Sequence, residues 1–307
     1  MSFAQEIEKR ALELGFLACG FVAARKLEEE ESNLHSWLNK GYQGTMGYLE
    51  RNLEKRLDPR HLVPGTQTIV CLAYNYFPQK SQKIESPKIA KYAYGEDYHR
   101  VVKDRCFELL KHIQNEYPNV KSRVFVDSAP VMERQWAQLA GLGWIGKNSL
   151  LLRKGIGSFF FLAEILLDVS IEAAPVIQSD HCGSCTRCID ACPTQAIVQD
   201  QVVDATKCIS YLSIEKTEPL EETELEMMHG WLFGCDICQD VCPWNRFSEP
   251  HEEPQFEASE AIDWNLEEWK TLQEAQFNTA FKKSPIARMG FPKAQQLLSQ
   301  FRKDSDL

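Results

Sequence analysis

The sequence predicts an α/β (α+β) domain, followed by a small domain built around metal and then a short helical tail. Three observations support this architecture: strands alternate with helices over residues 1–176, cysteines and turn residues dominate 177–247, and acidic and then helical segments fill 248–307. Of the 307 residues, 44% are hydrophobic and 25% are charged, which is typical of a globular protein rather than a disordered one.

The first 176 residues contain four predicted helices and four predicted strands. Apolar spacing predicts helices over 3–14, 33–40, 97–117 and 130–140, with Ser32 as an N-cap and Pro130 in a first helical turn. Apolar runs predict strands over 16–24, 68–77, 122–127 and 158–169. The longest run is too short to cross a membrane and the N-terminus resembles no secretory signal, so we expect a cytoplasmic protein without membrane contact.

Eleven cysteines in such a chain predict metal ligands rather than disulfides, because the cytosol keeps thiols reduced. The motif C-x2-C-x2-C-x3-C-P has the spacing of a bacterial ferredoxin, in which three cysteines hold one [4Fe–4S] cluster and the fourth ligates the other. By this rule one cluster takes Cys182, Cys185, Cys188 and Cys242, and the second takes Cys192, Cys208, Cys235 and Cys238. Structural zinc is the alternative, because C-x2-C pairs also bind Zn²⁺. The other three, Cys19, Cys71 and Cys106, lie in apolar patterns and are predicted to be buried thiols.

Asp127 ends a predicted strand and precedes a predicted helix, a position where side chains commonly face a cleft. A plain turn residue or helix N-cap is the alternative for the same position. The nearby glycines at 141, 143 and 146 spell G-x-G-x-x-G, but they follow a helix rather than a strand, which excludes a dinucleotide fingerprint. The net charge of −10 argues against a nucleic-acid partner, although basic residues gather over 51–60, around Lys147 and over 282–288.

The combination of segments resembles epoxyqueuosine reductase over residues 5–247. The resemblance rests on the paired cysteine motifs together with WLNKGYQGTMGYLERNLEKRLDPRHLVPG, KIAKYAYGEDYHRV, FVDSAPVMERQWAQLAGLGWIGKN and GSFFFLAEIL. It implies a cobalamin-binding N-terminal domain of the nitroreductase and reductive-dehalogenase type, and a ferredoxin-like domain with two [4Fe–4S] clusters. The implied reaction is reduction of the epoxide of epoxyqueuosine at the tRNA wobble position, giving queuosine.

The resemblance also implies roles for single residues. Asp127 matches the family's proton donor, which is needed because an epoxide oxygen leaves poorly as an alkoxide. The family binds cobalamin with its lower base detached and no protein ligand on cobalt, so His99 is expected to line the pocket rather than to ligate the metal. The expected cobalamin contacts are Arg56, His99, Asp127, Lys147, Asn148, Gly157, Ser158 and Ser210. Ordinary loop packing is the alternative for most of these positions.

The implied partners are a tRNA carrying epoxyqueuosine in its anticodon loop and a low-potential electron donor, and nothing in the sequence demands more than a monomer. The tail ends at Leu307 without the helical repeats into which longer family members continue. Two other functions stay open at this point. One is a corrinoid-dependent reductase or dehalogenase of a small molecule, and the other is a non-enzymatic electron-transfer module.

Overall fold

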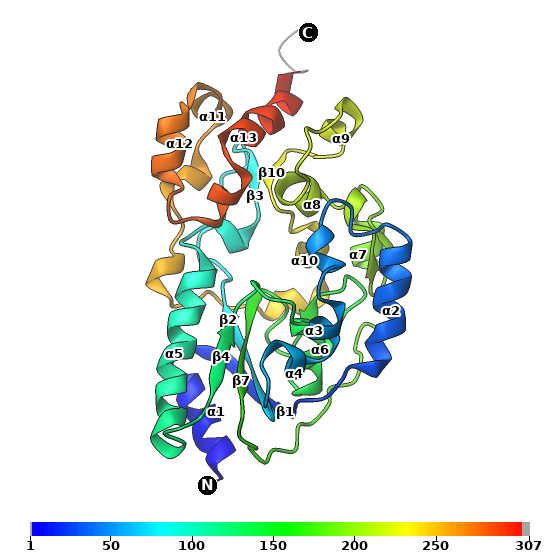
Figure 1. Cartoon of the computed structure of the whole chain (residues 1–307). Helices are drawn as coiled ribbons and strands as arrows, with labels where there is room; N and C mark the ends of the chain where they lie inside the picture. Colours follow the sequence, from blue (N-terminus) through cyan, green and yellow to red (C-terminus); the bar gives the residue numbers. More distant parts are fainter. Residues whose placement is uncertain (1, 303–307) are drawn as a thin grey trace.

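A four-stranded sheet in the order β1-β2-β7-β4 forms the centre of the first part of the chain in the computed structural model, which describes residues 2–302 (Figure 1). Every neighbouring pair of strands is antiparallel, a direction that the alternation of strands and helices had left open. The four predicted strands are confirmed as β1 (Phe16–Ala23), β2 (Thr68–Asn75), β4 (Ser122–Phe125) and β7 (Phe160–Leu167).

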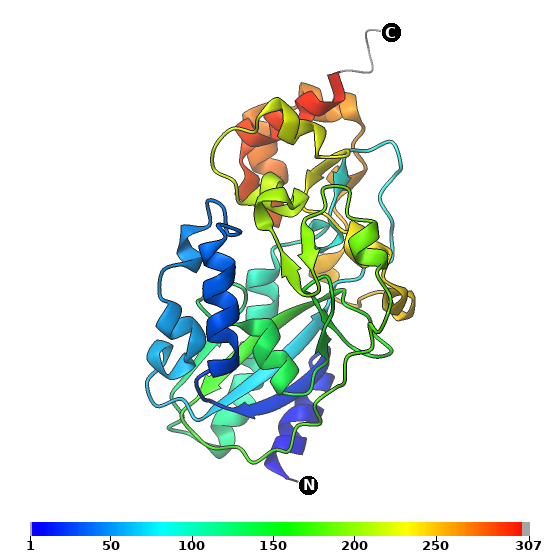
Figure 2. The ribbon, with the colours of Figure 1, turned by 90° about the vertical axis from the view of Figure 1, so that its right-hand side faces the viewer.

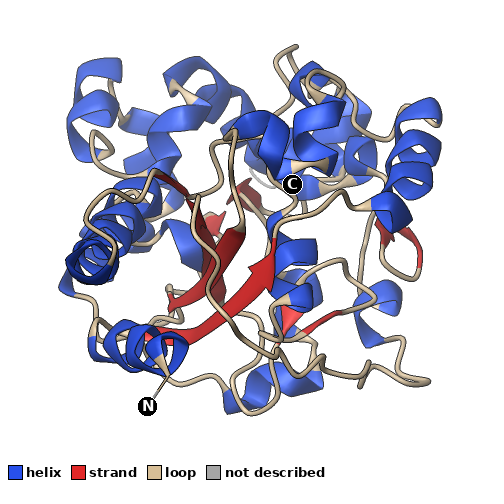
Figure 3. Ribbon diagram, turned by 60° about the horizontal axis from the view of Figure 1, so that its bottom comes forward, coloured by secondary structure: helices blue, strands red, loops and turns tan. Residues whose placement is uncertain are grey.

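Helices and loops cover both faces of this sheet, which explains why its central strands are continuous apolar runs rather than alternating ones (Figure 3). Successive residues of β2 point to opposite faces, so Val70 and Leu72 pack in one core and Ile69 and Cys71 in the other. The first core also contains residues of α1 (Phe3–Glu13) and α5 (Tyr98–Glu116), and the second contains residues of α6 (Glu133–Leu139).

Two predicted helix starts are wrong. The helix α2 (Glu28–Asn39) begins before Ser32, because four glutamates fill its first turn and are favoured by the positive end of the helix dipole. The helix α6 begins at Glu133, so Pro130 lies outside its first turn and belongs to the loop that follows β4.

The cysteine-rich region consists of short elements. Within the first cysteine motif and within the second, the chain forms a single helical turn, and these two turns, α7 and α10, contact each other. The elements of this region are α7 (Arg187–Asp190), β8 (Ile197–Gln199), β9 (Val202–Val203), η3 (Ala205–Lys207), α8 (Ile209–Ile214), α9 (Glu222–Glu226), β10 (Trp231–Phe233), α10 (Ile237–Asp240) and η4 (Pro243–Phe247).

The tail packs with the cysteine-rich region and with one segment of the first part of the chain, above the sheet in Figure 2. The strand β3 (Lys88–Ile89) pairs in parallel with β10, and Ile89 shares a core with Trp269, Phe277 and Phe281. The tail elements are η5 (Pro254–Phe256), η6 (Glu260–Asp263), α11 (Leu266–Thr271), α12 (Glu274–Ala280), η7 (Pro285–Met289), α13 (Phe291–Leu298) and η8 (Ser299–Arg302). Residues 303–307 of the predicted tail lie outside the described residues.

The remaining short elements connect the sheet to its surroundings. They are η1 (Gly47–Leu49), α3 (Leu53–Leu57), α4 (Pro59–Leu62), η2 (Lys91–Ala93), β5 (Trp144–Ile145) and β6 (Leu151–Leu152). Within residues 2–302, no helix has both the length and the apolar character needed to cross a membrane.

Candidate active site

Asp127 lies in the loop between β4 and α6, and its side chain is 57% exposed. Its backbone has a φ of +47°, in the left-handed region that aspartate tolerates better than most residues. The backbone N–H of Asp127 donates to Oε1 of Glu133 at 2.7 Å. The N-cap of α6 is Met132, so the interpretation of Asp127 as an N-cap is wrong. The loop instead presents its carboxylate to the surface.

Tyr98 and His99 approach Asp127 from the N-terminus of α5. The hydroxyl of Tyr98 donates a hydrogen bond to Oδ2 of Asp127, and Nε2 of His99 lies 3.9 Å from the same oxygen. Asp97 caps the helix by accepting the N–H of His99 at 3.0 Å, and its Oδ1 also lies 2.7 Å from Nδ1 of His99. Nδ1 of His99 thus bonds to Asp97, and Nε2 is the ring nitrogen that faces Asp127. Three polar groups from two elements thus meet at one point.

The ring of Tyr98 is held in place by stacking on Phe161 of β7, with ring centres 4.1 Å apart and planes inclined by 4°. Burial, followed by the charge of Asp127, raises the pKa of Tyr98. Tyr98 therefore stays a neutral phenol that donates its proton in a hydrogen bond and never competes with Asp127 as an anion.

Arg56 of α3 lies close enough to Tyr48 and Glu133 for both to act on its charge. Burial lowers the pKa of Arg56, while Tyr48 and Glu133 favour its charged form. Its Nε is buried and has no acceptor among residues 2–302. A buried donor without a partner is costly, so this N–H is available to a ligand.

The tail contributes a cation to the same neighbourhood. Nη2 of Arg288 lies 3.2 Å from Oε1 of Glu215, and the hydroxyl of Tyr48 lies 3.4 Å from Oε2 of that carboxylate. Burial opposes the charge of Arg288, but Glu215 and then Tyr98 and Asp127 raise its pKa overall. Arg288 is more than 150 residues away from Asp127 in the sequence, and only folding brings the two together.

Four other predicted residues lie where the first part of the chain meets the cysteine-rich region. Nζ of Lys147 pairs with Asp200 at 3.2 Å, and Nδ2 of Asn148 donates to the carbonyl of Cys238 at 3.4 Å. The backbone N–H of Ser158 donates to Oδ1 of Asn245 at 2.6 Å. The hydroxyl of Ser158 accepts from Nδ2 of Asn245 at 3.0 Å and from Nε2 of Gln239 at 3.1 Å.

Gly157 makes the closest approach in this interface. Its φ is +94°, and a Cβ there would lie 2.2 Å from Oδ1 of Asn245. We expect Gly157→Ala to destabilise the protein by about 1–2 kcal/mol for the left-handed backbone and about 1–3 kcal/mol for forced repacking. Unfolding by urea measures the loss.

The matched control is Gly155→Ala. Gly155 has a φ of +78°, but a Cβ there meets nothing within 4 Å, so only the backbone cost is expected. Equal destabilisation by the two variants would contradict the close packing of Gly157 against the cysteine-rich region.

The eight motif cysteines lie in two neighbouring sets. Burial is the main cause that raises the pKa of Cys188, and the nearby thiols of Cys182 and Cys242 raise it further. Cys185 in turn raises the pKa of Cys242. In the second set, burial is again the main cause of the raised pKa values. The thiols of Cys208 and Cys192 also raise the pKa of Cys235. Those of Cys235 and Cys208 raise the pKa of Cys238. Cys188 of the first set also raises the pKa of Cys238, so the two sets are adjacent.

Both cysteine sets receive backbone N–H groups. The N–H groups of Ser210 and Tyr211 point at Cys208, and that of Lys147 points at Cys182. Within residues 2–302, no three histidine, cysteine or carboxylate side chains converge on a site for a single ion. Cys19, Cys71 and Cys106 are buried in the sheet cores, as predicted.

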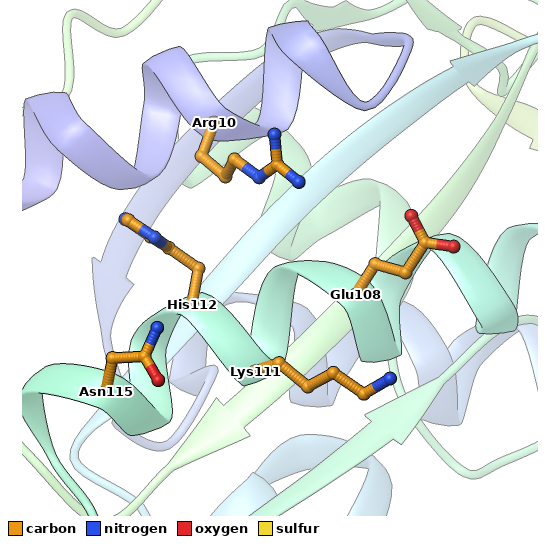
Figure 4. A pocket seen from close by; sticks show the side chains of 5 residues that line it. All are labelled: Arg10, Glu108, Lys111, His112 and Asn115. Carbon is orange, nitrogen blue, oxygen red and sulfur yellow. The ribbon is translucent and has the colours of Figure 1, made fainter.

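A separate shallow hollow lies between α1 and α5 (Figure 4). It is lined by Arg10, Glu108, Lys111, His112 and Asn115, and it includes none of the residues that the sequence singled out. Its lining side chains belong to the helices that cover one face of the sheet, and we assign it no part in the chemistry.

The sequence did not place Tyr48, Tyr98 or Glu133 near Asp127, and it gave Arg288 only as part of a basic segment. Two of them left a local signal. Tyr98 directly follows the helix-capping Asp97, and Glu133 is an acidic residue in the first turn of a helix that begins six residues after Asp127.

Comparison with known protein families identifies the metal chemistry. The family described as "4Fe-4S double cluster binding domain" matches residues 181–245, and the family described as "Epoxyqueuosine reductase QueG, DUF1730" matches residues 56–128. The first match favours iron–sulfur binding over the zinc alternative. An iron–sulfur segment in the same chain as a match to a reductase family indicates a redox protein.

Whole-chain comparisons identify which redox enzymes these are. Epoxyqueuosine reductase of Cyclobacterium marinum is 52% identical over 286 residues, covering 92% of this chain and 92% of that protein. Epoxyqueuosine reductase of Pseudomonas aeruginosa is 40% identical over 295 residues, covering 94% of this chain and 81% of that protein. The chain belongs to the epoxyqueuosine reductase family and is an oxidoreductase.

Solved structures agree with this family and its fold. A structure of epoxyqueuosine reductase with an epoxyqueuosine-modified tRNA-Tyr stem loop has a TM-score of 0.86 at 27% identity, covering 96% of this chain and 80% of that one. The Bacillus subtilis enzyme, with its catalytic aspartate loop swung out of the active site, has a TM-score of 0.89 at 26% identity and the same coverage.

Proposed function

We propose that this chain reduces the epoxide of epoxyqueuosine in tRNA to the cyclopentene of queuosine, with Asp127 as the proton donor. The observation that carries the proposal is the convergence of Tyr98, His99 and Glu133 on Asp127, an exposed acid at the end of β4. The similar protein with an epoxyqueuosine-modified stem loop supports tRNA as the substrate.

The reaction removes the epoxide oxygen as water, which takes two electrons and two protons as two C–O bonds break and a C=C bond forms. Asp127 donates a proton to the oxygen as the first C–O bond breaks, which avoids release of a free alkoxide. The Tyr98 hydroxyl then donates its hydrogen bond to the carboxylate that remains. Asp97 holds the ring of His99, which places a polar ring nitrogen beside that carboxylate.

We infer that two [4Fe–4S] clusters carry the electrons, one held by Cys182, Cys185, Cys188 and Cys242 and the other by Cys192, Cys208, Cys235 and Cys238. The neighbour relations of the thiols support this partition. When bound, such clusters store and pass single electrons. Backbone N–H groups such as those of Lys147 and Ser210 would hydrogen-bond the cluster-bound sulfurs.

Cobalamin is the cofactor that the family resemblance implies, and residues around Asp127 fit a large polar ring system. The buried Nε of Arg56 needs an acceptor, which the amide groups at the edge of a corrin provide. Arg56, His99 and Asp127 would contact it. The polar groups of Asn148 and Ser158 already bond to the cysteine-rich region, so these two residues would hold the two parts of the protein together. When bound, cobalamin supplies electrons at the substrate carbon.

We further propose that the enzyme acts as a cytoplasmic monomer that a low-potential donor reduces. Anaerobic reconstitution with iron, sulfide and cobalamin tests the function as a whole. Conversion of epoxyqueuosine to queuosine in tRNA is the expected result. Absence of conversion by protein with intact clusters and bound cobalamin would favour a small-molecule reductase instead.

Two basic segments flank the candidate site and are our candidates for tRNA phosphate contacts. The carbonyl of Lys283 accepts the N–H of Asp97 at 2.6 Å, so Lys282 lies beside the start of α5. Arg51 lies just before α3, the helix of Arg56. In the part of the chain that the structure describes, neither Arg51 nor Lys282 forms an ion pair, whereas Lys283 pairs with Glu96 at 3.3 Å.

We therefore expect Lys282→Ala to weaken binding of the tRNA stem loop and to flatten its dependence on salt. Loss of one phosphate contact lowers the slope of log K against log salt by about 0.7–1. Fluorescence anisotropy at several salt concentrations measures the slope. Lys111→Ala, in the hollow between α1 and α5, is the matched control. A slope that is the same in both variants would remove Lys282 from the tRNA interface.

A further inference from the structure

Glu164 is a carboxyl group buried at the centre of the sheet, directly below the Asp127 loop. It is fully buried on β7, and the register of β4 and β7 pairs it with Phe125, two residues before Asp127. Neither of its carboxyl oxygens meets an N–H or O–H donor within residues 2–302. An isolated buried carboxylate in such a place is strongly disfavoured.

Among residues 2–302, the side chain of Glu133 lies close enough to Glu164 for the two carboxyl groups to interact. Two carboxyl groups can form a hydrogen bond only when one of them carries a proton, because two carboxylates have only acceptors. Glu133 also accepts the backbone N–H of Asp127 at 2.7 Å. A short chain of contacts therefore leads from Glu164 through Glu133 to the proton donor.

The surroundings keep the shared proton on this pair. Burial raises the pKa of both carboxyl groups, and each raises the other's further by proximity. On the Glu133 side, the facing groups are Asp127, Arg134, Arg56 and Tyr98. On the Glu164 side, the facing groups are Asp127, whose negative charge opposes a second anion, and the buried thiols Cys71 and Cys106, which carry no charge to offset one.

We propose that Glu133 and Glu164 share one proton at neutral pH and together position Asp127 for its reaction. Glu133 is the positioning residue, because it accepts the Asp127 N–H and so holds the loop in its left-handed conformation. The shared proton allows the two carboxyl groups to lie side by side without two negative charges.

The need for such a hold is physical. A non-glycine residue with positive φ is strained and stays so only where its surroundings enforce it. The Bacillus subtilis relative has been seen with its catalytic aspartate loop swung out of the active site, which marks the corresponding loop of that protein as movable. The inference rests on the proposed role of Asp127, and its tests are chosen so that the two can fail separately.

The first test is independent of activity. Infrared difference spectra of the reconstituted protein at neutral pH, wild type minus Glu164→Gln, are expected to show the carbonyl band of a protonated carboxyl. The band should be lost as the pH rises and the pair releases its proton. A wild-type protein without this band at neutral pH would overturn the shared proton, whatever the enzyme's substrate proves to be.

The second test is rescue of queuosine formation by the conservative variant. In Glu133→Gln the side-chain oxygen can still accept the Asp127 N–H, and the amide N–H can donate to Glu164 in place of the shared proton. Glu133→Gln should therefore retain most of the activity, whereas Glu133→Ala, which has no acceptor for the Asp127 N–H, should lose it. In Glu164→Gln the amide N–H likewise replaces the shared proton, so the activity should stay near that of the wild type.

Glu8→Gln, on the exposed side of α1, is the matched control for both substitutions. If Glu133→Gln lowers activity as much as Glu133→Ala does, the acceptor oxygen of Glu133 does not position Asp127 and the proposal is wrong. If Asp127→Asn retains full activity, the proposed function of Asp127 fails, and the infrared band alone decides whether the carboxyl pair exists.

Discussion

Asp127→Asn is expected to slow queuosine formation by about 10²–10⁴-fold, which is the usual contribution of a general acid. Asparagine has the same shape and tolerates the φ of +47°, and its carbonyl can still accept the hydroxyl of Tyr98. Its amide cannot deliver a proton to the epoxide oxygen. Turnover of tRNA carrying epoxyqueuosine, with cobalamin and a low-potential reductant, measures the loss.

The control for this substitution is Asp104→Asn, which makes the same chemical change at an exposed position of α5. It should leave the rate unchanged, and both variants should retain wild-type iron and cobalamin. Equal turnover by Asp127→Asn and wild type would leave the family assignment intact and remove Asp127 from the role of proton donor.

Cys238→Ala is expected to remove one cluster and to abolish turnover. The pKa of Cys238 is raised by Cys235 and Cys208 of its own set and by Cys188 of the other set. Cys238 therefore lies where the two sets meet. Loss of its thiolate should lower the iron content from roughly eight to roughly four atoms per chain. Electrons would then have no continuous path to the site around Asp127. Iron analysis and electron paramagnetic resonance measure the cluster content.

Cys106→Ala is the matched control for this second substitution, because Cys106 is a buried cysteine of α5 outside the two motifs. It should retain both clusters and the activity, apart from a modest loss of packing. Iron loss in both variants would indicate that the substitution acts through folding. Full iron content in Cys238→Ala would exclude Cys238 as a ligand and overturn the proposed partition.

The comparison of predicted and observed elements shows which features are encoded locally. The strands β2 and β7 were predictable because each is a mainly apolar run, interrupted in β7 by Glu164, as expected of strands covered on both faces. The start of α2 was not predicted correctly, because the N-cap preference of Ser32 competes with four glutamates that are favoured at the positive end of the helix dipole. The start of α6 differed because Pro130 belongs to the Asp127 loop.

The sequence by itself determined the iron–sulfur chemistry, because its signature is a spacing of cysteines within a few residues of one another. It also pointed to Asp127 through its position between a strand and a helix. Only the tertiary structure decided which side chains meet around that acid. Tyr98 reaches it through the packing of α5, Glu164 lies below it through the β4–β7 register, and Arg288 arrives with the tail. Such contacts depend on the relative placement of elements distant in sequence, which local patterns of polarity do not encode.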